Sequence, residues 1–292
     1  MLRVLAVLVL LVSVAPVAHA GRGTNLVKYL PDDTNVIVIA DVSRARRSPI
    51  FKKAFEAARS KSDTLDNLAS TLAVDKLVDT IAVGGNGAAQ RAVVVLEGRV
   101  DKLLAEAKKQ ATKEDKHGGV AFWTVPDGEV AVVDKKLVIA SAGEMEHVID
   151  RAQDKKAKGP AAVRTILASA TANSSVFGGA VLDADQKKEM AKEIGAEPQW
   201  AAFSFAMAQK LTIDAKVKLA DDASAEKVAK SINEKLGAPG EDGTNRSRIE
   251  GFVGKDFADS IVVDQDHSFA RISATMSADE FDKVLALVKM FM

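Results

Sequence analysis

Cysteine is absent from all 292 residues of the sequence. A chain without thiols forms no disulfide bonds, has no cysteine nucleophile, and cannot hold zinc or an iron–sulfur cluster through cysteine. Aromatic residues make up only 5% of the chain, so the hydrophobic core must come mainly from Val, Ile, Leu and Ala. These absences exclude a small disulfide-stabilised scaffold and a thiol enzyme.

The chain also lacks an excess of charge of either sign. It contains 40 basic and 40 acidic residues. Nucleic-acid binding depends on basic side chains that displace counterions from phosphates, so we expect no nucleic-acid partner. Hydrophobic residues form 47% of the sequence, which is sufficient for a folded core of one or two domains.

Long apolar runs are missing except at the N-terminus. Arg3 precedes the apolar run Val4–Val12, and Ala18-His19-Ala20 places small residues at the two positions that a signal peptidase reads. This order is typical of a secretory signal peptide cleaved between Ala20 and Gly21. The run is too short for a transmembrane helix, which needs about 20 apolar residues. No cysteine follows for lipid attachment, so we expect a periplasmic or secreted protein with no transmembrane span after residues 1–20 are removed.

The rest of the chain alternates short β-rich runs with amphipathic segments, which predicts an α+β fold. We expect strands at 35–42, 80–83, 92–96, 120–125, 130–133, 137–140, 175–182, 201–207, 211–219, 261–263 and 270–276. We expect helices near 49–58, 65–72, 100–111, 144–152, 183–194, 224–236 and 281–291.

A similar order of strands and helices occurs twice, which predicts a degenerate internal duplication. We expect a first domain at 21–157, a linker or connecting helix at 158–172, and a second domain at 173–292. The glycine-rich stretch 237–254 is expected to be a mobile insertion. Each half resembles the ferredoxin-like split βαβ arrangement, with antiparallel sheets and helices on one face.

One short segment resembles a known group of sequences. Leu30-Pro31-Asp32-Asp33-Thr34 precedes an apolar strand, and Arg47-Ser48-Pro49-Ile50-Phe51 follows it. This pattern is similar to the LPxDT-type strand opening of an uncharacterised family of exported bacterial proteins. The resemblance implies an exported α+β protein and brings no activity and no functional residues.

Two pairs of acidic residues follow apolar strands. Asp264 and Asp266 are similar to the Asp-x-Asp opening of haloacid-dehalogenase-type phosphatases, but too little chain follows to supply the other catalytic residues. A polar turn between two strands is the favoured interpretation, and a metal site at this pair is the alternative. Asp183 and Asp185 form the second pair, and Gln186 three residues after Asp183 predicts a helix capping box instead.

The densest cluster of one charge is basic and lies between the first strand and the following helix. It consists of Arg44, Arg46, Arg47, Lys52 and Lys53. An anionic partner could dock there, although a solvated helix entry is the favoured interpretation of the charges.

The sequence contains no clustered nucleophile, base or metal-ligand set. We therefore expect an exported, non-enzymatic binding or interaction protein with no cofactor. Its partner is expected to be an envelope protein or an anionic ligand. The alternative is a metal-dependent hydrolase or phosphatase that uses an Asp-x-Asp pair.

Overall fold

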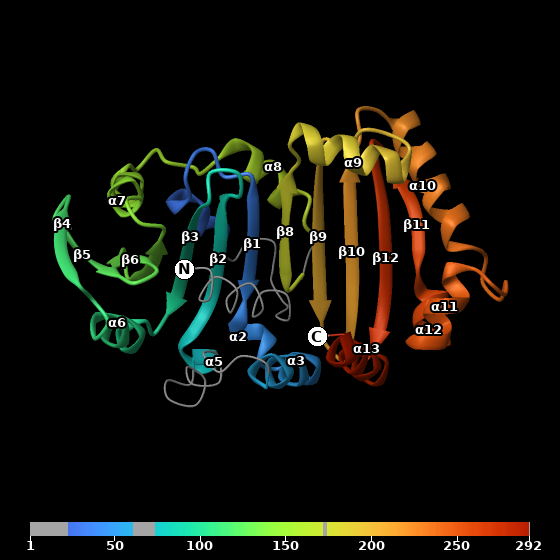
Figure 1. Cartoon of the computed structure of the whole chain (residues 1–292), viewed down its shortest axis with the longest axis horizontal. Helices are drawn as coiled ribbons and strands as arrows, with labels where there is room; N and C mark the ends of the chain where they lie inside the picture. Colours follow the sequence, from blue (N-terminus) through green and yellow to red (C-terminus); the bar gives the residue numbers. More distant parts are fainter. Residues whose placement is uncertain (1–22, 61–73, 172–173, 292) are drawn as a thin grey trace.

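The computed structural model describes residues 23–60, 74–171 and 174–291, and its strands form one twelve-stranded antiparallel sheet (Figure 1). The strand order is β11-β12-β10-β9-β8-β1-β2-β3-β7-β6-β5-β4. The strands are β1 (Val36–Asp41), β2 (Val78–Asn86), β3 (Arg91–Gly98), β4 (Lys113–His117), β5 (Val120–Val125), β6 (Gly128–Val133), β7 (Lys136–Ala140), β8 (Val176–Val181), β9 (Trp200–Met207), β10 (Lys210–Lys218), β11 (Val262–Asp266) and β12 (Phe269–Ser277). The predicted α+β class is confirmed.

Helices connect the strands and pack against the sheet. They are the 3-10 helix η1 (Thr24–Tyr29) and the α-helices α2 (Val42–Ala45), α3 (Pro49–Arg59), α5 (Val74–Leu77), α6 (Asp101–Lys108), α7 (Met145–Gln153), α8 (Ala161–Ala168), α9 (Ala184–Ile194), α10 (Asp222–Leu236), α11 (Asn245–Phe252), α12 (Lys255–Ser260) and α13 (Ala278–Phe291). Across the described ranges, none of them has the length and apolar character needed to cross a bilayer.

The centre of the sheet joins the two halves of the chain. β1 pairs antiparallel with β8, with Val36 opposite Ala180 and Ala40 opposite Val176. Strands from both halves therefore belong to one sheet, where the sequence led us to expect separate sheets. In Figure 1 the second half continues the first without a break between strands.

The strand order is similar on the two sides of this junction. Outward from the centre, one side reads β1-β2-β3-β7-β6 and the other reads β8-β9-β10-β12-β11. This shared order is what the repeated sequence pattern predicts. The duplication and the domain boundaries at 157 and 173 stay predictions.

Side chains of β1 alternate between two hydrophobic cores, as a strand with both faces buried requires. Ile37 and Ile39 enter a core that includes η1, α7 and α8, and we call this side face one. Ala40 enters the opposite core with α2 and α3, and Val38 packs against it, so we call that side face two. The expected one-sided helix arrangement is therefore wrong for the first half, whose sheet is covered on both faces.

The predicted helix start at Asp183 is confirmed in atomic detail. The Asp183 carboxylate accepts hydrogen bonds from the backbone N–H groups of Asp185 and Gln186, both at 2.9 Å. Gln186 in turn accepts from the Asp183 backbone N–H at 3.1 Å, which completes the capping box. Ser277 and Glu280 form the same reciprocal pair at the start of α13. The acidic residues at Asp183 and Asp185 thus have a structural role as capping and first-turn residues.

The segment 158–172, expected to be a linker or a connecting helix, contains α8, because Val163, Ile166 and Leu167 form a buried apolar stripe at helical spacing. Two differences from the expected elements have physical causes. The stretch 237–254 contains α11, where the buried Arg246 donates to the carbonyl oxygens of Gly237 at 3.0 Å, Ala258, and Ile261 at 3.2 Å. The edge strand β4 was not predicted, because its polar sequence carries no apolar pattern. The predicted signal peptide at 1–20 and the helix at 65–72 lie outside the described residues.

Candidate functional site

The 3-10 helix η1 supports the wall of a surface pocket. Leu26, Val27 and Tyr29 are buried in the face-one core, which fixes the orientation of the helix. The helix begins after Gly23, whose φ of 89° is in the left-handed region. This anchoring leaves the polar residues Thr24, Asn25 and Lys28 at the pocket.

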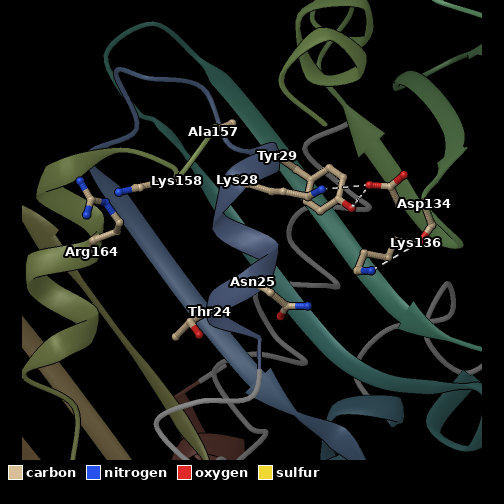
Figure 2. A pocket seen from close by; sticks show the side chains of 9 residues that line it. All are labelled: Thr24, Asn25, Lys28, Tyr29, Asp134, Lys136, Ala157, Lys158 and Arg164. Atoms are coloured by element: carbon tan, nitrogen blue, oxygen red, sulfur yellow. Dashed lines mark hydrogen bonds and ion pairs between the residues drawn. The ribbon is translucent and has the colours of Figure 1, made fainter. Parts of the chain in front are cut away.

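The pocket has a volume of about 620 Å³ and a strongly basic lining (Figure 2). Four cationic side chains and one carboxylate line it, and we call it the cationic pocket. Its lining residues are Thr24, Asn25, Lys28, Tyr29, Asp134, Lys136, Ala157, Lys158 and Arg164. They come from η1, the β6–β7 turn, the start of β7, the segment before α8, and α8 itself.

The one carboxylate of the pocket is held by two neighbours. Lys28 Nζ lies 2.9 Å from Asp134 Oδ2, and the Tyr29 hydroxyl donates to the same oxygen at 3.1 Å. The hydrogen bond from Lys28, with help from Tyr29, lowers the pKa of Asp134. Burial and the nearby Asp134 carboxylate raise the pKa of Tyr29, so the phenol stays protonated and keeps donating.

The remaining positive charges of the pocket are weakly compensated. Lys158 and Arg164 are exposed, and neither side chain forms a hydrogen bond or ion pair with any other described residue. Lys136 Nζ lies 3.4 Å from the Asp134 backbone oxygen and 3.8 Å from Glu97 Oε1. An anion in the pocket would therefore meet several N–H donors whose charge is not already neutralised.

A second pocket of about 730 Å³ adjoins the first. The two share Asn25, Asp134 and Lys136. We call it the mixed pocket because acidic and basic side chains both line it; the residues that it does not share are Gly23, Asp79, Thr80, Glu97, Gly98, Arg99 and Lys135.

The basic cluster predicted from the sequence lies outside both pockets, and its side chains contact different partners. Arg46 Nη2 donates to the Val78 carbonyl oxygen at 2.6 Å and lies 3.4 Å from Asp79. Lys53 forms an ion pair with Asp282 of α13. Arg44, Arg47 and Lys52 complete the cluster, and none of its members lines either pocket. Anion docking at this cluster stays a prediction.

The Asp264–Asp266 pair lies on the edge strand β11. Asp264 Oδ2 is 3.9 Å from Arg271 Nη1, and Asp266 is exposed. Within the described ranges, no group of three or more His, Cys, Asp or Glu side chains could hold a metal ion. A metal-dependent hydrolase stays an untested alternative.

Comparison with known proteins finds structures with a similar fold and gives no indication of function. No protein-family model matches the sequence, and no curated protein matches it. Crystal form IV of TP0453 is similar in structure, with a TM-score of 0.50 and 7% sequence identity over 90% of this chain and 95% of that chain. Crystal form I has a TM-score of 0.49 and 9% identity over 89% and 96%. At such identities the similarity concerns the fold alone.

The cationic pocket was not found from the sequence. Its basic residues are spread along the sequence from Lys28 to Arg164, in four separate segments. The sequence-based search favoured local charge density, which identified residues 44–53 instead. Only the sheet topology, which places the β6–β7 turn and α8 beside η1, brings the pocket residues together.

Proposed function

We propose that this protein is an exported, non-enzymatic binding protein and that its cationic pocket binds an anionic ligand. The observation behind this proposal is the charge of the pocket lining, which contains Lys28, Lys136, Lys158 and Arg164 and a single carboxylate. The N-terminal signal-peptide pattern supports export. The volume of about 620 Å³ falls within the range of small-molecule sites, roughly 300–1,000 Å³.

The chemistry of the lining favours a carboxylate or a phosphate. Arg164 can present two parallel N–H donors to such a group, while Lys158 supplies a mobile point charge. Asp134 is already hydrogen bonded by Lys28 and Tyr29, so its repulsion of an incoming anion is reduced. The site is open to solvent, and binding should therefore weaken as salt is added.

Isothermal titration calorimetry with inorganic phosphate and with acetate tests the proposal. We expect saturable binding at low salt, with affinity reduced about 5-fold or more in Arg164→Gln and in Lys158→Gln. Arg248→Gln is the matched control, because Arg248 is also an exposed arginine on a helix but lies on α11, outside the pocket. Equal affinities in wild type, Arg164→Gln and Lys158→Gln would refute the assignment.

A further inference from the structure

The two pockets together form a groove whose ends differ in charge, one basic and the other mixed. They meet at Asn25, Asp134 and Lys136. In Figure 2, Lys158 and Arg164 lie on one side of η1, and Asp134 and Lys136 lie on the other. The groove is thus basic at its α8 end.

The mixed pocket at the opposite end adds two carboxylates that the cationic pocket lacks, and Arg99 and Lys135 line it beside them. Asp79 and Glu97 line only the mixed pocket. Glu97 Oε1 lies 3.8 Å from Lys136 Nζ, which is beyond hydrogen-bonding distance, and its side chain is 39% exposed. Asp79 lies 3.4 Å from Arg46 and is 49% exposed. Both carboxylates therefore retain acceptor sites for a further donor.

We propose that this groove binds a short peptide with free termini. The peptide carboxylate lies against Lys158 and Arg164, and its terminal ammonium lies against Glu97 and Asp79. The carboxylate end of this inference rests on the proposed function of the cationic pocket, and the ammonium end is new.

The chemistry of a peptide fits each part of the groove. An ammonium group offers three donors and no acceptor, which suits a pair of carboxylates. Asn25 lines both pockets, and its side-chain amide both donates and accepts, as hydrogen bonding to a peptide group requires. An extended peptide spans about 3.3–3.6 Å per residue, so a few residues can connect two adjoining pockets. A small inorganic anion would occupy only the basic end.

The test is isothermal titration calorimetry with alanine peptides from dialanine to pentaalanine. The best-binding length is then compared with its N-acetylated and its C-amidated form. We expect each modification to weaken binding about 5-fold or more, because each removes one terminal charge.

A substitution at Glu97 tests the ammonium end of the groove independently of the basic end. In Glu97→Gln, the preference for the free over the N-acetylated peptide should fall, because only Asp79 remains to accept from the ammonium, while inorganic phosphate binds as it does to the wild type. Glu234→Gln is the control, since Glu234 is an exposed glutamate on α10 away from both pockets. This control should keep the wild-type preference for the free amine.

Three results would overturn the inference while leaving the proposed function standing. The first is equal binding of the free and N-acetylated peptides to the wild type. The second is equal binding of the free and C-amidated peptides, and the third is no binding of any alanine peptide although phosphate binds. Failure of phosphate, acetate and every peptide to bind would refute both proposals.

Discussion

Asp214 on β10 anchors a buried polar network, and its replacement by alanine gives a sharp test of how the second half of the sheet is held. Its side chain is 4% exposed. Arg271 of β12 donates to it twice, from Nε to Oδ1 at 3.0 Å and from Nη2 to Oδ2 at 3.2 Å. The hydroxyl of Thr171, in the segment that connects the two halves, donates to the same carboxylate.

The magnitude follows from what Asp214→Ala leaves behind. Breaking a buried ion pair by removing one partner costs about 3–5 kcal/mol of unfolding free energy. The Arg271 side chain is 34% exposed, so water can solvate part of the guanidinium after the change. Asp264 also remains 3.9 Å away. We therefore expect a loss of about 2–3 kcal/mol, below the range for a fully buried pair.

Urea denaturation followed by circular dichroism measures this loss as a change in the midpoint at constant slope. Asp266→Ala is the matched control, because Asp266 is an exposed carboxylate on the same sheet face. It should change the unfolding free energy by less than about 0.5 kcal/mol. A loss in Asp214→Ala no larger than that of the control would refute the network's structural role.

Three further predictions concern the edge strand, the central strands and export. The hydrogen bond to Asp150 raises the pKa of His117, so the pair stabilises the fold below about pH 6.5 and the effect is lost as pH rises through the higher folded-state pKa. His117→Gln should therefore lower Tm at about pH 5.5 and not at about pH 9, and an equal change at both would contradict this. Gly179→Ala would place a methyl group against the β9 backbone and about 2.7 Å from Ile166, which should cost about 1–3 kcal/mol in a urea titration; no loss would contradict the packing. Intact-mass measurement of protein from its native host should give a chain that starts at Gly21, whereas a full-length cytosolic species would contradict export.

The sequence predicted most strands correctly because their apolar residues alternate or run continuously. The run Asn35–Val42 is an example: its core, Val36–Asp41, is the central strand β1 with both faces packed. The sequence also predicted the capping box of Asp183 and Gln186, because the two partners lie only three residues apart. Local patterns of this kind need no knowledge of the tertiary structure.

Features that depend on distant contacts were missed. Residues 237–254 suggested a mobile insertion because they contain five glycines. In the structure, however, the Arg246 side chain on α11 donates to the carbonyl oxygens of Gly237, Ala258 and Ile261. The division of the helices between two faces was not predicted, because strand alternation does not reveal which segments will cover each face. The cationic pocket was invisible for the same reason, since Lys28 and Arg164 become neighbours only through the sheet order.

The most direct test of the proposed function is a titration of the ¹⁵N-labelled protein with inorganic phosphate, followed by NMR. The account predicts backbone amide shifts that saturate and concentrate at Asn25, Lys158 and Arg164. Shifts concentrated instead at Arg47 and Lys52, in the basic cluster that the sequence favoured, would contradict the assignment of the cationic pocket.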